Sequence, residues 1–278
     1  MKIALNALQA RHPAAAPAAA PVLRLEQLDV RAGEQLAVIG PSGAGKTTLL
    51  QVLACALPPS AGMLRLDGVD PWAARPAELQ ALRRALFLAP QVPPLPPRQR
   101  VVTAVLAGRL PHESLWASLR SLFYPQDIPL AHRALAALDL GDKLFERVDR
   151  ISGGERQRVG LARLLAAQAR LWLVDEPLSA LDPTRARQAL HTLTTQAQER
   201  GATLVATLHQ VDMALAHFPR IVGLRDGAVA FDLPTAEVTP ALLHALYAQH
   251  LDELSAAAPA PWVDAPAAAP APVAMHCR

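Results

Sequence analysis

The feature that most constrains this sequence is a glycine-rich stretch, Gly-Pro-Ser-Gly-Ala-Gly-Lys-Thr, at residues 40–47. It follows a short apolar run at residues 35–39, and residues 46–56 behind it carry the apolar spacing of a helix. Such glycines let the backbone bend until several N–H groups and the positive end of the helix face one anion. An ordinary glycine-rich turn is the alternative, and the strand–loop–helix context favours a loop that binds nucleotide phosphates.

The side chains of this loop suit a nucleotide that carries a metal ion. Lys46 can neutralise the charge of the β- and γ-phosphates, and the Thr47 hydroxyl can ligate Mg²⁺. The expected contacts to ATP are Gly40, Pro41, Ser42, Gly43, Ala44, Gly45, Lys46, Thr47 and Thr48.

Two neighbouring carboxylates end a second apolar run, Leu-Trp-Leu-Val at residues 171–174. Because sites of α/β proteins lie at strand ends, Asp175 is predicted to hold Mg²⁺ and Glu176 to act as the general base for water. Taken alone, two acids at a strand end are equally well explained as solvated turn residues. Together with the glycine-rich loop they favour ATP hydrolysis.

The sequence Ser152-Gly153-Gly154-Glu155 precedes another helical stretch, residues 155–169. Ser-x-x-Glu is a capping box, which explains the serine and the glutamate by helix stability alone. A cap does not require two glycines, and their small size lets a phosphate approach the N–H groups at the positive end of the helix. The sequence therefore predicts a second anion site at Ser152, Gly153 and Gly154.

Alternating elements indicate the fold class. Apolar runs at residues 171–174 and 203–208 each follow a helical stretch, at residues 155–169 and 183–200. This alternation predicts a parallel sheet covered by helices.

Other segments depart from that alternation. Short apolar runs beside Asp-Gly pairs, at residues 63–68 and 221–231, predict antiparallel hairpin pieces. A helical subdomain is expected at about residues 93–160, inserted into a mixed α/β core. The chain is expected to divide into three parts. Residues 1–21 contain one strand within 1–10 and a Pro/Ala-rich segment after it, and residues 22–254 form the nucleotide-binding domain. Residues 255–278 form a disordered Ala/Pro-rich tail.

Composition excludes several classes of protein. The 27 basic and 24 acidic residues give a net charge of only +3, without the concentrated basic face of a nucleic-acid binder. Cys55 and Cys277 form no CxxC pair, so neither a disulfide framework nor a zinc site is expected, and a reducing compartment is the default. The sequence has no proline-free apolar run of about 18 residues. Lys2 and residues 3–8 weakly resemble a signal peptide, but Asn6 and Gln9 interrupt a stretch already at the short limit, so export is not expected.

With these motifs in this order, residues 22–250 resemble the ATP-binding subunits of ABC transporters. Residues 151–158, Ile-Ser-Gly-Gly-Glu-Arg-Gln-Arg, resemble the family signature loop, which contacts the γ-phosphate held by a second subunit. The resemblance implies a dimer of two copies, each completing the site of the other. It also implies that Gln91 senses Mg²⁺ and touches a permease, that Asp182 contacts the nucleotide from the D-loop, and that His209 contacts the γ-phosphate. Taken alone, His209 would be a structural histidine.

The candidate roles then divide into two groups. Lys46, Gln91, Glu176 and His209 are the catalytic candidates, and Thr47, Gln91 and Asp175 are the candidates for holding Mg²⁺.

A narrower resemblance is to the ATP-binding subunit of importers for phosphonates, phosphite and phosphate esters. It lies in residues 105–109, 114–123, 208–212 and 220–227, although an apolar helical stripe also explains the segment around Trp116. The resemblance implies an integral membrane permease as partner, a periplasmic solute-binding protein as indirect partner, and a peripheral place on the cytoplasmic face of the inner membrane. An importer of a different solute remains an alternative.

Two positions depart from the family pattern. His12 stands where the family usually places an aromatic residue against adenine. Residues 92–97, Val-Pro-Pro-Leu-Pro-Pro, replace polar or aromatic residues after Gln91, and because each proline fixes φ, altered coupling to the helical subdomain is expected.

Two further classes share parts of this pattern. Soluble ABC ATPases of DNA repair or translation usually carry tandem cassettes or long coiled-coil insertions, and neither is visible here. A regulatory module that binds nucleotide without hydrolysing it is disfavoured by intact Lys46, Asp175 and Glu176.

Overall fold

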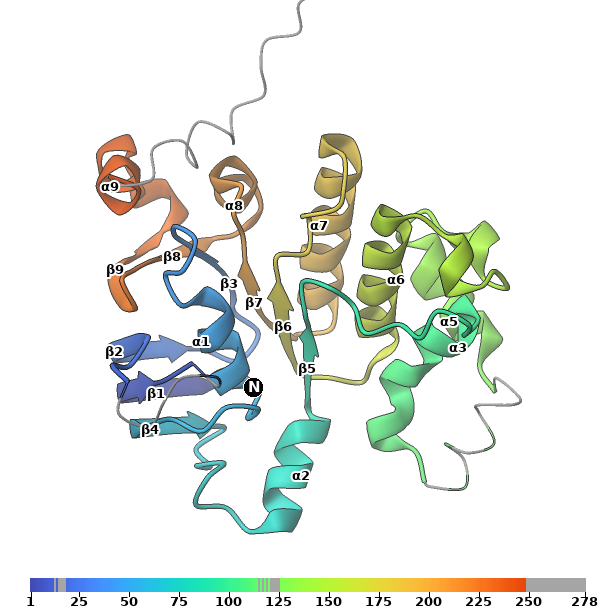
Figure 1. Cartoon of the computed structure of the whole chain (residues 1–278), viewed down its shortest axis with the longest axis horizontal. Helices are drawn as coiled ribbons and strands as arrows, with labels where there is room; N and C mark the ends of the chain where they lie inside the picture. The colour runs from blue at the N-terminus through green and yellow to red at the C-terminus, as the bar shows by residue number, and fades with distance from the viewer. Residues whose placement is uncertain are drawn as a thin grey trace, which may run out of the picture.

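The computed structural model describes residues 1–12, 14, 19–114, 116, 118, 120 and 126–248. A six-stranded sheet forms its centre, in the order β5-β6-β7-β3-β8-β9 (Figure 1). Neighbouring strands are parallel except that β9 pairs antiparallel with β8. The strands are β3 (Gln35–Ile39), β5 (Leu86–Ala89), β6 (Leu171–Asp175), β7 (Thr203–Thr207), β8 (Arg220–Arg225) and β9 (Ala228–Pro234).

The central sheet separates two hydrophobic cores. Strand β6 is buried at every position, which explains its unbroken apolar sequence, and its successive side chains point to opposite faces. Leu171 and Leu173 join the core on the side of the first helix, whereas Trp172 and Val174 join the core on the other side. Asp175, the last residue of β6, and Glu176 behind it therefore stand at the edge of a sheet that is covered on both faces.

A second sheet of three antiparallel strands has the order β2-β1-β4. Its strands are β1 (Ile3–Ala10), β2 (Leu23–Val30) and β4 (Ala61–Leu66). In β2 the inward leucines alternate with exposed polar residues, as in a sheet with one solvated face. Helix α1 lies between the two sheets (Figure 1).

The helices cover the outer faces of this core. Helices α6, α7 and α8 lie against the opposite face of the main sheet from α1, and α3, α5 and α6 pack together into a helical subdomain (Figure 1). The helices are α1 (Lys46–Leu53), α2 (Pro76–Arg84), α3 (Val101–Leu106), α5 (Ile128–Ala136), α6 (Gly153–Ala166), α7 (Pro183–Glu199), α8 (Val211–His217) and α9 (Pro240–Leu246), with short 3-10 turns η1 (Ala107–His112), η2 (Gly141–Lys143), η3 (Val148–Arg150) and η4 (Thr235–Glu237).

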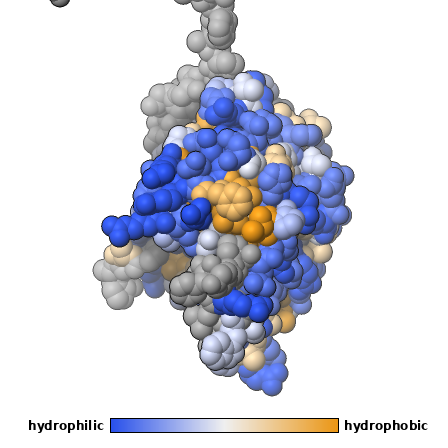
Figure 2. All heavy atoms as spheres, turned by 90° about the vertical axis from the view of Figure 1, so that its right-hand side faces the viewer, coloured by the Kyte–Doolittle hydropathy of each residue, from blue (hydrophilic) through white to orange (hydrophobic). Residues whose placement is uncertain are grey.

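The face that includes the helical subdomain carries an apolar patch surrounded by hydrophilic residues (Figure 2). Exposed large apolar side chains of this subdomain include Phe145 and Ile128. In the part of the chain that the structure describes, no helix has both the length and the apolar character needed to cross a bilayer.

The predicted mixed α/β fold is confirmed, and so are its central strands, its long helices and the strand in residues 1–10. One hairpin prediction is corrected: β4 pairs with β1, and its Asp-Gly turn leads only to a single bridge between Leu66 and Val69. Strands β2 and β5 were not predicted. The tail at 255–278, most of residues 13–18, and Leu115, Leu119 and Leu122 lie outside the described residues, while the neighbouring Trp116 is largely exposed.

Candidate nucleotide-binding and catalytic site

The glycine-rich loop joins β3 to α1 and leaves the first turn of α1 open. Gly45 is the N-cap of α1 with φ of 97°, in the left-handed region that glycine occupies without strain. No side chain caps this helix start, and its first turn holds no acidic residue. The backbone N–H groups and the positive end of α1 therefore face the loop, as anion binding requires.

Contacts at the base of the loop hold it in shape. A Cβ on Gly40 would lie 2.0 Å from the carbonyl oxygen of Leu224, so only glycine fits where the loop leaves β3. The N–H of Gly40 donates to the Tyr247 hydroxyl at 3.1 Å. Lys46 Nζ donates to the carbonyl oxygens of Gly40 at 2.7 Å and Pro41 at 3.1 Å. Lys46 is only 5% exposed, and its ammonium group is held against its own loop.

A cavity of about 290 Å³ lies over this loop. Its lining consists of His12, Val22, Ser42, Gly43, Ala44, Gly45, Lys46, Thr47, Thr48, Glu176 and His209. The structure therefore brings the predicted phosphate loop, the predicted general base and the predicted adenine contact to one space. Gly40 and Pro41 lie at the base of the loop rather than in this lining.

The two carboxylates at the end of β6 have different surroundings. Asp175 is buried, and its Oδ1 accepts a hydrogen bond from the Thr207 hydroxyl at 2.6 Å. Glu176 has φ of 46°. Its Oε1 lies 2.6 Å from His209 Nε2, and its Oε2 accepts from Gln91 Nε2 at 2.7 Å. Three predicted catalytic residues are therefore in direct contact.

The charge state of Glu176 follows from two opposing effects. Burial alone would raise the pKa of this carboxyl, because a charged group loses its hydration. The hydrogen bond and charge of His209, with the more distant charge of Lys46, outweigh burial and bring the pKa below its usual value. Glu176 is therefore ionised at neutral pH, which is the form that a general base requires.

The donor set beside the loop fits a magnesium ion. Mg²⁺ is usually held by one or two protein oxygens together with phosphate oxygens and waters. Thr47 lines the cavity, and helix α1, which carries it, packs against β6. Asp175 ends β6 and is not part of this lining; it lines a neighbouring cavity next to β5. Gln91 is outside this lining and reaches the site through its hydrogen bond to Glu176.

The second predicted anion site stands apart from this cavity. The predicted capping box is formed: the Ser152 hydroxyl accepts from Glu155 N–H at 3.2 Å, and the Glu155 carboxylate accepts from Ser152 N–H at 2.7 Å. A Cβ on Gly153 would meet no atom within 4 Å, whereas one on Gly154 would lie 2.8 Å from the carbonyl oxygen of Ala180. Ser152 and Gly153 are exposed, so this helix start is open to another molecule.

Asp182 also lies outside the cavity lining. It is the N-cap of α7, where its side chain accepts a hydrogen bond from Arg185 N–H at 3.1 Å. In the single chain its contacts are therefore those of a helix cap.

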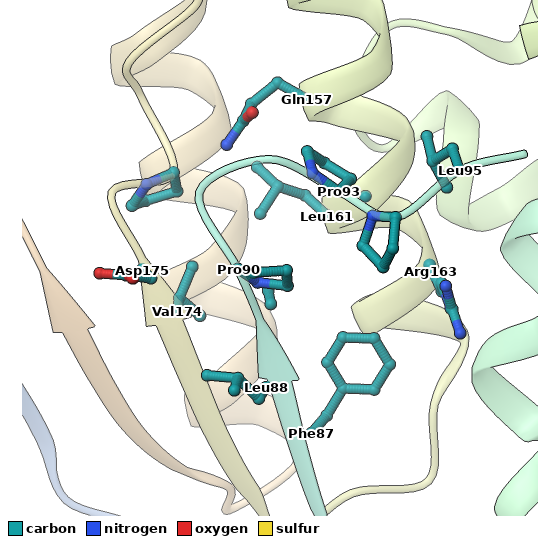
Figure 3. Close-up of a pocket in the computed structure, with 14 residues that line it drawn as sticks. Phe87, Leu88, Pro90, Pro93, Leu95, Gln157, Leu161, Arg163, Val174 and Asp175 are labelled. Atoms are coloured by element: carbon teal, nitrogen blue, oxygen red, sulfur yellow. The ribbon is translucent and has the colours of Figure 1, made fainter. Parts of the chain in front are cut away.

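A second cavity, of about 130 Å³, lies between β5, the proline-rich loop after Gln91 and the signature helix α6. Figure 3 shows Phe87, Pro90, Pro93 and Leu161 around it. A Cβ on Gly160 of α6 would lie 2.5 Å from Pro93 Cγ, so the stiff loop rests directly on this helix.

Two residues of the site were missed by sequence reasoning. Thr207 belongs to the predicted apolar run at residues 203–208, although a hydroxyl at the end of a buried strand is a signal for a polar partner. Tyr247 carries no such signal, because its partner Gly40 is 207 residues away in the chain.

Comparison with known proteins extends these observations. The family described as "ABC transporter" matches residues 23–179. The chain is 73% identical over 278 residues, all of both chains, to the "Phosphonates import ATP-binding protein PhnC 2" of Albidiferax ferrireducens. It is 57% identical over 234 residues to the protein of the same name from Pseudomonas aeruginosa, covering 84% of this chain and 88% of the relative.

Solved structures agree on the fold. A dimeric bacterial ABC transporter cassette superposes with a TM-score of 0.73 at 24% identity, over 84% of this chain and 98% of its own. A bacterial Atm1-family ABC exporter with ATP bound gives a TM-score of 0.73 at 24% identity, over 91% of this chain and 42% of its own. By its sequence match, by its relatives and by its fold, this chain belongs to the ABC transporter family.

Proposed function

We propose that this chain is the ATP-binding and ATP-hydrolysing subunit of an importer for phosphonates or related phosphorus compounds. The observation that carries the enzymatic part is that the phosphate loop and the ionised Glu176 line one cavity. The names of the two relatives above support the cargo, since one of them is similar over the whole chain. An integral membrane permease is the partner that this activity requires, and a periplasmic solute-binding protein is its indirect partner. The chain then lies peripherally on the cytoplasmic face of the inner membrane.

Two copies act together in this proposal. Each ATP lies between residues 40–48 of one copy and Ser152, Gly153 and Gly154 of its twin. Support comes from the open helix start at Gly153 and from its separation from the cavity within one chain. Asp182, which follows the end of β6 in the chain, lies in the interface between the two copies.

Within this sandwich, each residue has a defined task. Glu176 orients water and accepts its proton, while Lys46 and His209 stabilise the negative charge that develops on the γ-phosphate. On nucleotide binding, Glu176 exchanges its bonds to Gln91 and His209 for contacts to water and nucleotide. Thr47, Gln91 and Asp175 would hold Mg²⁺, which would supply neutralisation of the phosphate charge. His12 stacks on adenine at the edge of the cavity.

The loop after Gln91 transmits closure to the permease. Its prolines rest on α6, which begins with the signature residues, so the two predicted nucleotide sites are mechanically connected through Pro93 and Gly160. The cavity in Figure 3 lies at this junction and belongs to the surface that the permease contacts.

Glu176→Gln tests the proposal. We expect turnover of the complex with its permease to fall by about 10²–10⁴, because the general base is lost, while ATP binding persists and ATP-dependent dimers accumulate. The matched control is Glu26→Gln, an exposed acid on β2. Uptake of labelled methylphosphonate by cells that depend on this chain should fall in parallel. Wild-type hydrolysis in Glu176→Gln would remove Glu176 from its role, and uptake of an amino acid in place of phosphonate would overturn the cargo.

A further inference from the structure

We infer that Thr207 is a positioning residue whose single hydroxyl holds both carboxylate residues of the site. The inference rests on the proposed ATP hydrolysis and adds to it a residue that no motif of the sequence contains. Thr207 is the last residue of β7, and its side chain is fully buried. In the sheet it stands directly beside Asp175 of β6.

The hydroxyl of Thr207 makes two hydrogen bonds of opposite direction. Its Oγ1 donates to Asp175 Oδ1 at 2.6 Å, a short distance typical of a bond to a charged carboxylate. The same Oγ1 accepts from the N–H of Glu176 at 3.0 Å. A hydroxyl has one donor and two acceptor positions, so both bonds form together without conflict.

The bond to Asp175 sets the direction of the carboxylate. A buried carboxylate without a donor would be poorly held and poorly compensated. Because Oδ1 is bonded to Thr207, Oδ2 is the oxygen that would hold a metal ion. Residues that orient a metal-holding group in this way typically change metal affinity or activity by about 10- to 100-fold when they are replaced.

The bond to Glu176 holds an unusual backbone. Glu176 has φ of 46°, in the left-handed region that residues with a Cβ occupy only at some cost. Its N–H donates to two oxygens of Thr207, Oγ1 at 3.0 Å and the carbonyl oxygen at 3.2 Å. This arrangement directs the Glu176 side chain to the place between Gln91 and His209.

Replacing the hydroxyl alone tests the inference. Thr207→Val keeps the shape and the preference for a strand but removes both bonds, and Thr207→Ser keeps the hydroxyl. The matched control is Thr203→Val at the other end of β7, because Thr203 is also fully buried and its hydroxyl bonds lie away from the cavity. That hydroxyl donates to the Met1 carbonyl oxygen at 2.7 Å and accepts from the Met1 ammonium and from Gly33 N–H, each at 3.0 Å. Thr207→Ala serves as a second variant without the hydroxyl if Thr207→Val does not fold.

The measurement is the dissociation constant of ATP for the full chain, with Mg²⁺ and with EDTA. For Thr207→Val we expect about tenfold weaker binding in Mg²⁺ and little change in EDTA, with Thr207→Ser near wild type. Turnover with the permease should fall by about 10- to 100-fold in Thr207→Val and recover in Thr207→Ser.

Three outcomes overturn the inference. The first is that Thr207→Val weakens ATP binding equally with and without Mg²⁺. The second is that Thr203→Val weakens ATP binding as much as Thr207→Val does. The third is that neither Thr207→Val nor Thr207→Ala weakens ATP binding. A wild-type chain that neither binds nor hydrolyses ATP contradicts the proposed function instead, so the two failures are distinguishable.

Discussion

Helices α1 and α6 both begin at predicted phosphate sites, yet their first turns are built differently. Helix α1 starts at a glycine in the left-handed region, without a side-chain cap and without an acidic residue in its first turn. Helix α6 starts at Ser152 with a complete capping box, and Glu155 lies in its first turn. The N–H of Ser152 donates to this carboxylate and lowers the pKa of Glu155, so a negative charge stands beside the helix start at neutral pH.

This difference indicates which of the two helix N-termini binds the nucleotide first. The N–H groups at the start of α1 have no competing side-chain cap, and Lys46 adds a positive charge beside them. At α6 the N–H of residue 155 is already used, and the nearby carboxylate disfavours a free anion. We therefore expect α1 to bind ATP in the single chain and α6 to contribute only when the twin copy presents a bound nucleotide.

The strongest test of this order is Lys46→Ala. Loss of one partner of a buried charge interaction costs about 2–5 kcal/mol, so ATP binding by the single chain should weaken at least about thirtyfold. Titration with a fluorescent ATP analogue, at protein concentrations where single copies predominate, measures this constant. Binding near the wild-type value would show that the start of α1 is not the main ATP site of the single chain.

Tyr247→Phe tests the base of the α1 loop. The ring stays, but the buried N–H of Gly40 loses its acceptor, which costs about 1–3 kcal/mol. Thermal unfolding should report this loss, and ATP should restore part of it by mass action. Leu246→Ala, at a buried neighbour on α9, is the control that disturbs packing without touching the loop. An unchanged melting temperature in Tyr247→Phe would contradict the assigned bond.

Ser152→Ala tests the α6 end. Loss of a helix cap costs about 1 kcal/mol, and we expect ATP binding by the single chain to stay unchanged while turnover of the dimer falls. Thr239→Ala removes the equivalent cap from α9, where the hydroxyl accepts from Leu242 N–H at 3.3 Å, and should leave turnover intact. Weaker ATP binding by the single chain in Ser152→Ala would mean that α6 takes part earlier.

The contrast between these sites also shows what a sequence can predict. The α1 loop, the acids after β6 and the start of α6 were predicted because each is a local pattern whose chemistry follows from neighbouring residues. Strand β5 was missed because it has only four residues, of which only the last is buried, and it follows α2 without a turn signal.

The contacts that assemble the site could not be predicted from local sequence patterns. Thr207 meets Asp175 through the register of two strands 32 residues apart, and Tyr247 meets Gly40 across 207 residues. The contact of Pro93 with Gly160 depends on how the helical subdomain packs against the main sheet. Such pairings follow from the completed fold, so a single sequence does not display them.

The smallest effect is predicted for the contact between Pro93 and α6. Its measurement tests how the phosphate site at α1 and the helix start of α6 are coupled. In a free helix, Gly160→Ala would gain up to about 1 kcal/mol. Here the new Cβ would lie 2.5 Å from Pro93 Cγ, and overpacking costs about 1–3 kcal/mol, so the net loss of stability should be near 1 kcal/mol.

A double-mutant cycle of Gly160→Ala with Pro93→Ala isolates this contact, because removing the proline ring should relieve the clash. Chemical unfolding of the four proteins gives the coupling energy, and turnover with the permease shows whether the clash also disturbs closure. Additive effects would mean that the proline-rich loop moves away from α6 without cost. The α1 and α6 ends would then be connected only through the nucleotide that both of them bind.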